Sequence, residues 1–152
     1  MALRERFTDE LKAAMKSGEK TKVAAIRLIQ AALKDRDIEA RGADKGPLGE
    51  DEILGLLQKM LKQRQESIAI YDQNARPELA DAERAEVAVI EGFMPRQLGE
   101  EEMKAAIEAA IAATGAASMK DMGKVVAALR AEHAGRMDFG KASALVKARL
   151  SA

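Results

Sequence analysis

Apolar residues recur at intervals of three and four along nearly the whole chain, and this spacing limits the fold more than any other feature. Leu3, Phe7 and Leu11 begin the pattern. No stretch alternates apolar and polar residues as a half-buried strand would. The sequence therefore predicts an all-α protein, with about four helices that include a long antiparallel hairpin, a break, and then a small three-helix bundle. The last three helices are expected at residues 100–113, 119–132 and 139–150.

Two stretches interrupt the helical pattern. The first is "GADKGPLG" at residues 42–49, which has the glycine and proline content of a loop. The second is "EGFMPRQL" at residues 91–98, where Pro95 disfavours helical geometry at the residue before it. Apolar residues surround this second break, so Phe93 and Leu98 are expected to pack into the parts on either side. We accordingly expect an N-terminal subdomain at residues 1–94 and a C-terminal tail subdomain at residues 95–152.

The composition excludes several classes of protein. The 152 residues contain no cysteine, and 25 basic side chains balance 25 acidic ones. Disulfides and thiol chemistry are thus excluded, which fits a reducing compartment. No apolar run reaches the length of a membrane span, and the charged N-terminus "MALRERFTDELK" has no signal-peptide core. The sequence predicts a cytoplasmic protein with no membrane association.

Charged residues fall on the apolar face of the expected hairpin. Arg64 lies in the stripe that Leu57, Leu61 and Ile68 make on the third helix, and Glu83 and Glu86 lie on the stripe of the fourth helix. Because a buried arginine needs a partner, we expect Arg64 to pair with Glu83 or Glu86. Two carboxylates on one face also suit acid–base chemistry or a metal, but an arginine at the same level favours a structural role.

Residue types that carry catalysis are scarce. His133 is the only histidine and is expected to be a polar group at a helix end. No cluster has metal-ligand spacing, no serine lies in a nucleophile motif, and no glycine-rich loop follows a strand. The sequence therefore predicts no catalytic residues, no metal, no cofactor and no enzymatic activity for this chain alone.

The final segment is basic although the whole chain is neutral. Residues 115–152 contain seven basic and three acidic side chains, whereas residues 91–114 contain two basic and five acidic ones. A bias of this size arises by chance in short segments, and it also suits a surface that faces a polyanion. The candidate phosphate-binding residues are Lys120, Lys124, Arg130, Arg136 and Lys141.

Three runs in order, "KQRQESIAIYDQNARPELADAERAEVAVIEGFMPRQL", "MGKVVAAL" and "GRMDFGKASALVKARL", make the chain similar to the GatB/YqeY family. The matching positions hold their order and spacing over some ninety residues. They are Lys62, Arg64, Ser67, Tyr71, Arg76, Leu79, Glu83, Glu86, Pro95 and Leu98 in the first part, and Met122, Gly123, Lys124, Gly135, Arg136, Asp138 and Lys147 in the second.

The resemblance implies a helical N-terminal subdomain followed by a three-helix tail. It also implies a relation to the tail of the B subunit of the tRNA-dependent amidotransferase, where that tail grips tRNA. The parts of the amidotransferase that would hold ATP, Mg²⁺ and glutamine have no counterpart here, so amidotransferase activity would be inherited by homology alone. The implied partner is tRNA, and an amidotransferase or an aminoacyl-tRNA synthetase is a further candidate.

The resemblance and the charge count point to the same segment. Lysine and arginine bind phosphates without reading sequence, and this segment has few aromatic residues for stacking. We therefore expect recognition of the shape and backbone of a folded RNA. Three alternatives stay open, namely a non-catalytic adaptor that docks through a helical groove, an enzyme or enzyme subunit, and a helix-turn-helix DNA-binding protein.

Overall fold

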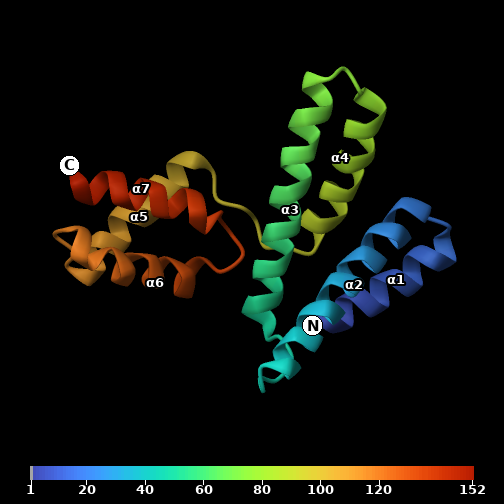
Figure 1. Cartoon of the computed structure of the whole chain (residues 1–152), viewed down its shortest axis with the longest axis horizontal. Coiled ribbons are helices and arrows are strands. Elements are labelled where there is room, and N and C mark those ends of the chain that lie inside the picture. Colours follow the sequence, from blue (N-terminus) through green and yellow to red (C-terminus); the bar gives the residue numbers. More distant parts are fainter. Residues whose placement is uncertain (1) are drawn as a thin grey trace. The chain divides into compact units, whose positions relative to one another are not determined.

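The computed structural model describes residues 2–152, and in this range helices and short connections account for the chain, with no strand (Figure 1). The expectation of an all-α fold is confirmed. Contacts divide the chain into two units, of which the first ends at Pro95 and the second begins at Arg96. The first unit contains α1 (Leu3–Ser17), α2 (Lys20–Gly42), α3 (Glu50–Gln73) and α4 (Pro77–Gly92), and the second contains α5 (Glu100–Thr114), the 3-10 turn η1 (Met119–Asp121), α6 (Met122–His133) and α7 (Phe139–Ser151).

The first unit consists of two helical hairpins, α1 with α2 and α3 with α4, and α2 packs against both helices of the second hairpin (Figure 1). Gly18 ends α1 with a φ of 74°, a left-handed conformation that glycine adopts without strain. Phe7 and Phe93 meet edge to face with ring centroids 4.9 Å apart. The core is aliphatic elsewhere and is made by Leu3, Phe7, Ile26, Ile29, Leu33, Ile53, Leu56, Leu57, Met60, Leu61, Ile90 and Phe93.

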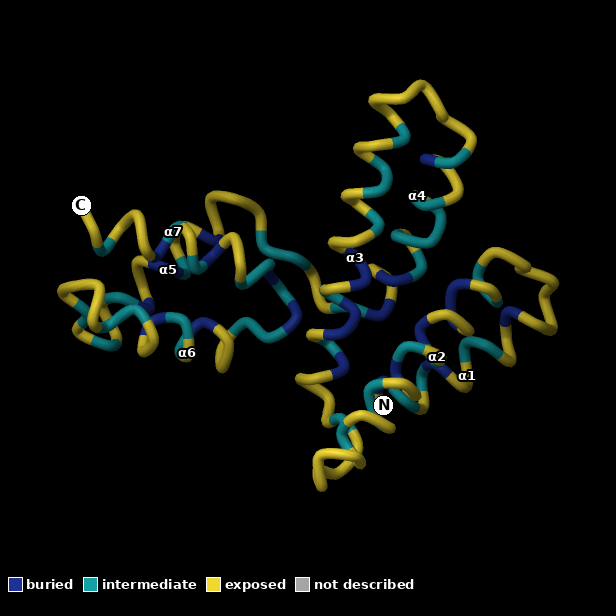
Figure 2. The backbone as a smooth tube through the Cα atoms, viewed as in Figure 1, coloured by how far each residue is buried: buried dark blue, intermediate teal, exposed yellow. Residues whose placement is uncertain are grey.

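The α3–α4 hairpin is buried at its base and more exposed toward its tip. The fully buried side chains of α3 end at Leu61, and beyond it Ile68 and Tyr71 are half-buried (Figure 2). At the tip Arg76 N donates to Tyr71 O at 2.9 Å, and Pro77 occupies the first turn of α4, where the lack of an N–H group costs nothing. The outer half of this hairpin is therefore stabilised by contacts between α3 and α4 more than by the main core.

An ion pair between side chains holds the connection between α2 and α3 in place. Arg4 donates to both oxygens of Asp37 at 2.9 Å and to Leu48 O at 2.9 Å, and Leu48 N donates to Asp37 Oδ1 at 3.0 Å. The Arg4 guanidinium and the Leu48 N–H lower the pKa of Asp37 from 3.8 to about 2. The expected loop is present, and its last residues are tied to both α1 and α2.

The depressed pKa of Asp37 predicts acid sensitivity of the first unit. A carboxyl group with a lower pKa in the folded state stabilises the fold above its unfolded pKa, and this contribution disappears as the pH falls from about 4 to about 2. We expect Asp37→Asn to lower the free energy of unfolding at neutral pH by about 1 kcal/mol, because the pair is partly exposed. Unfolding by urea at several pH values measures this; a variant as acid-sensitive as the parent would contradict the assignment.

The second unit is a three-helix bundle in which α6 packs against both α5 and α7 (Figure 1). Asp121 accepts from Ala117 N at 2.9 Å and so shapes the turn before α6, which explains why the helix expected from Met119 begins as a 3-10 turn. Asp138 caps α7 by accepting from Gly140 N at 2.9 Å and Lys141 N at 3.3 Å. The core consists of Met103, Ile107, Ala110, Val125, Leu129, Met137, Ala142 and Val146.

The "EGFMPRQL" stretch divides its apolar residues between the two cores. Phe93 is 3% exposed and belongs to the core of the first unit, and Leu98 packs against the core of the second. Arg6 donates to Gly92 O at 3.0 Å and lies 5.1 Å from the centre of the Phe93 ring. Leu98 N in turn donates to Arg136 O at 2.8 Å. Each half of the stretch is thus part of its own unit.

Candidate nucleic-acid interface

Four of the five candidate phosphate-binding residues lie on the surface of the second unit. Lys120, Lys124, Arg130 and Lys141 are exposed. Among the residues that the structure describes, no ion pair joins any of these four to a carboxylate. Lys124 does lie close enough to Asp121 to help lower the pKa of that carboxyl group, after the Ala117 and Ser118 N–H groups. Within the described residues none of the four is held in a salt bridge, as an interface with phosphates requires.

Arg130 is held in place by an aromatic ring. Its guanidinium carbon lies 5.3 Å from the centre of the Phe139 ring, which belongs to the first turn of α7. Such a contact attracts the cation to the ring face and leaves the guanidinium N–H groups free to donate. Phe139 itself is half-buried against the core, as expected for the one aromatic residue of this unit.

Arg136 differs from the other candidates because the structure uses it internally. It is half-buried, its Nε donates to Arg96 O at 3.3 Å, and its carbonyl accepts from Leu98 N. It also lies near Glu102, whose pKa falls to about 2, first because of the Arg96 guanidinium and then because of the Gly99 N–H. Arg136 therefore connects the entry segment of this unit to the α6–α7 connection, a role that no pattern in the sequence indicates.

The exposed bases form two groups at opposite ends of α6. Lys120 and Lys124 lie where α6 begins, whereas Arg130 lies in its last turn and Lys141 in the following first turn of α7. The 12 residues of α6 span about 18 Å. Lys147 is also exposed and lies toward the end of α7, which runs back along α6, so it joins the first group. Sequence reasoning counted its charge but did not include it among the candidates.

Acidic side chains of this unit gather on α5. Glu100, Glu101 and Glu102 occupy its first turn, where the helix dipole favours negative charge. Further along α5, Glu108 Oε1 accepts from Arg149 Nε at 2.6 Å. The α6–α7 side is consequently the more positive side of the unit, and α5 is the more negative one.

The expected ion pair of the hairpin lies within the first unit. Arg64 Nε donates to Glu86 Oε2 at 2.7 Å, and Arg64 Nη1 donates to Met60 O at 3.3 Å. The side chains are 15% and 28% exposed respectively, so the pair is partly and not fully buried. Glu83 is half-buried about one turn away and, among the described residues, takes no part in this pair.

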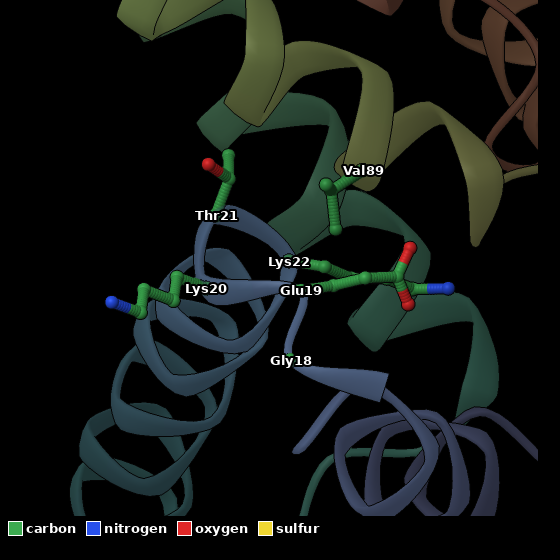
Figure 3. A pocket seen from close by; sticks show the side chains of 6 residues that line it. All are labelled: Gly18, Glu19, Lys20, Thr21, Lys22 and Val89. Atoms are coloured by element: carbon green, nitrogen blue, oxygen red, sulfur yellow. The ribbon is translucent and has the colours of Figure 1, made fainter. Parts of the chain in front are cut away.

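The residue types that could bind a metal or carry catalysis are scattered in the part of the chain that the structure describes. Within residues 2–152 no three histidine or acidic side chains gather as a metal site would require, and no helix has both the length and the apolar character of a membrane span. His133 is the last residue of α6, at a helix end as expected. Its side chain is 15% exposed, its Nε2 lies 3.9 Å from Glu132 Oε2, and its Nδ1 has no hydrogen-bond partner among the described groups. The hollow of Figure 3 lies at the α1–α2 turn and is lined by Gly18, Glu19, Lys20, Thr21, Lys22 and Val89.

These features define a class of protein: all-helical, in two units, with a cationic side on its C-terminal bundle. The model of the YqeY-like protein family matches residues 4–150, and the chain belongs to that family. It is 33% identical over 85 residues to altered inheritance of mitochondria protein 41, mitochondrial, of Candida glabrata, and 34% identical over 85 residues to the protein of that name from Eremothecium gossypii. The matched regions are 56% of this chain and 46% and 45% of the relatives, so the chain spans less than half of their length.

The expectation of a cytoplasmic location is contradicted by these comparisons. The names of the curated relatives designate them as mitochondrial proteins. The expectation rested on the absence of cysteine and of a signal-peptide core. A lack of cysteine excludes disulfides but does not distinguish one reducing compartment from another. That inference is therefore withdrawn.

Proposed function

We propose that this protein is a tRNA-binding module that takes part in tRNA-dependent amidotransfer and does not catalyse the reaction by itself. The observation that carries the proposal is the set of exposed bases on the second unit, none of which forms a salt bridge among the described residues: Lys120, Lys124, Arg130 and Lys141. Membership of the family supports it, because the GatB/YqeY resemblance relates this unit to a tail that grips tRNA.

The proposed mechanism is electrostatic. Lysine and arginine side chains on the rigid helices would replace the counterions of RNA phosphates, which gives affinity without reading bases. Because Arg136 is engaged with the entry segment, the four exposed bases carry the interaction and Arg136 holds their scaffold. A protein partner, such as an amidotransferase or an aminoacyl-tRNA synthetase, would supply the chemistry.

Binding of purified tRNA at several salt concentrations tests the proposal. With about four phosphates neutralised, we expect the affinity for tRNA to fall by roughly 10²-fold between about 50 and 200 mM salt. Lys124→Glu with Lys141→Glu should reduce both the affinity, by at least about tenfold at low salt, and the slope of the salt dependence.

A matched control is the pair Lys12→Glu and Lys59→Glu, which changes the total charge equally through exposed lysines of the first unit. The control should bind tRNA almost as the parent does. Absence of tRNA binding at low salt, or equal affinity of the two double variants, would refute the proposal.

A second candidate function is a non-catalytic adaptor that docks on a protein. It is favoured by large apolar side chains left exposed on the first unit, including Leu28 at 46%, Ile38 at 55% and Ile70 at 56%. Salt distinguishes the two functions, because docking of apolar surfaces does not weaken steeply as salt rises. Binding to an amidotransferase subunit that persists at high salt without RNA would favour the adaptor.

A further inference from the structure

The second unit has no surface on which single-stranded bases could stack. Phe139 is its only aromatic residue, and this ring is half-buried and covered by the Arg130 guanidinium. Proteins that bind single strands combine a cationic groove with exposed aromatic rings on which successive bases stack. A single strand would therefore gain only its phosphate contacts from this unit.

The cations are arranged for a ligand that offers phosphates at two separated places. One group consists of Lys120, Lys124 and Lys147, and the other consists of Arg130 and Lys141. The helix α6 separates them by up to about 18 Å, and all five side chains rise from elements that pack on one core. A flexible strand would lose conformational entropy to reach both groups, whereas a rigid duplex holds its two phosphate backbones apart before binding.

The surface of α6 between the two cationic groups is made of small residues. Gly123, Ala127 and Ala131 follow one another at intervals of four and are exposed, so they form one face of the helix. Lys124 and Arg130 flank this face, because residues six apart on a helix lie about 120° apart around its axis. Because the residues of this face are small, a wide and shallow groove of a ligand could approach α6 closely enough to reach both cationic groups.

We propose that the second unit binds A-form double-stranded RNA across its shallow minor groove, with one cationic group on each phosphate backbone and with Lys147 as part of the site. The inference rests on the proposed function and narrows it to the duplex stems of the RNA. Recognition through backbone and groove shape is the usual mode for double-stranded RNA, because its deep major groove excludes side chains. Base sequence then has little influence.

The test uses the full chain and four probes: an RNA duplex of about 16 base pairs, one of its single strands, a DNA duplex of the same sequence, and an RNA duplex of shuffled sequence. Dissociation constants are measured at one salt concentration, with purified tRNA as a reference. We expect the two RNA duplexes to bind equally and at least about tenfold more tightly than the single strand or the DNA.

Two variants test the arrangement of the site. Lys120→Glu with Lys147→Glu should weaken duplex binding at least about tenfold, whereas Lys104→Glu on α5 should change it less than threefold. Ala127→Gln adds a side chain to the exposed α6 face without touching the core, and it should weaken the duplex several-fold while leaving the single strand unchanged. Circular dichroism confirms that each variant is folded.

The outcomes separate the two proposals. If tRNA binds but the single strand binds as tightly as the duplex, the inference about duplex RNA is overturned and the proposed function stands. Unchanged duplex binding by the Lys120 and Lys147 double variant overturns the assigned site in the same way. If neither tRNA nor any other RNA binds at low salt, the proposed function itself fails.

Discussion

Replacement of Phe93 by alanine is expected to lower the free energy of unfolding of the first unit by about 3–5 kcal/mol. The Phe93 ring is 3% exposed and packs edge to face on Phe7, and the Arg6 guanidinium lies over it at 5.1 Å from the ring centre. Truncation leaves a cavity at the end of α4, because close-packed neighbours relax only partly into the space that the ring occupied. Urea unfolding measures the loss, with the fluorescence of Tyr71, the only tyrosine, as a probe of the first unit.

Two variants serve as controls for this prediction. Phe93→Leu retains most of the buried volume and should cost less than about 1.5 kcal/mol. Phe139→Ala removes the aromatic ring of the second unit and should leave the unfolding transition seen by Tyr71 unchanged. If Phe93→Ala unfolded at the same urea concentration as the parent, Phe93 would not contribute to the core of the first unit.

Removal of the Arg64 side chain is expected to cost about 2 kcal/mol. Arg64→Ala leaves the Glu86 carboxylate in a partly buried seam without its 2.7 Å partner, and it also frees the Met60 carbonyl. Breaking a fully buried pair costs about 3–5 kcal/mol, and the residual exposure of both side chains here reduces that figure. Thermal and urea unfolding of the variant give the loss directly.

Another arginine of the same hairpin forms exposed ion pairs, with which the Arg64 pair can be compared. Arg84 pairs with Asp72 at 2.6 Å and Asp81 at 2.8 Å, but these side chains are about half exposed or more. Arg84→Ala should therefore lower the free energy of unfolding clearly less than Arg64→Ala does, because exposed ion pairs contribute little to stability. The double variant Arg64→Met with Glu86→Leu should recover most of the stability that Arg64→Ala loses, because no charge is left unpaired. Equal losses for Arg64→Ala and Arg84→Ala would argue against a structural role for the partly buried pair.

The helices could be predicted from periodicity because each one buries an apolar stripe against a neighbour. Hairpin geometry further placed Arg64 opposite the fourth helix. It could not decide between Glu83 and Glu86, which are one turn apart on the same face, because that choice depends on the rotamers of both side chains. The 3-10 turn before α6 is accompanied by a hydrogen bond in which Ala117 N donates to Asp121 Oδ2, and the spacing of apolar residues does not indicate this bond.

The candidate interface was only partly visible in the sequence. A charge count locates the basic segment, but it contains no information on which bases share an end of the bundle. The antiparallel course of α6 and α7 sets that grouping and brings Lys147 toward Lys120. Arg136 has a structural role because its carbonyl accepts a hydrogen bond from Leu98 N, 38 residues earlier in the chain. No local sequence pattern indicates a contact over that separation.

Carboxylates fasten the connections of this protein, while its cores contain none. Glu52 and Glu102 accept from the N–H groups of Gly49 and Gly99 at the starts of α3 and α5, and Asp37, Asp121 and Asp138 fix three further connections. Among the described residues, every fully buried side chain of the two cores is apolar. We therefore expect acid to weaken the connections of the molecule and heat to weaken its apolar cores. We expect a fall in pH to loosen first the connections held by Asp37, Glu102 and Asp121, because guanidinium or N–H partners lower the pKa of each of these carboxyl groups. The apolar cores would remain, which is the physical description of an acid-expanded state.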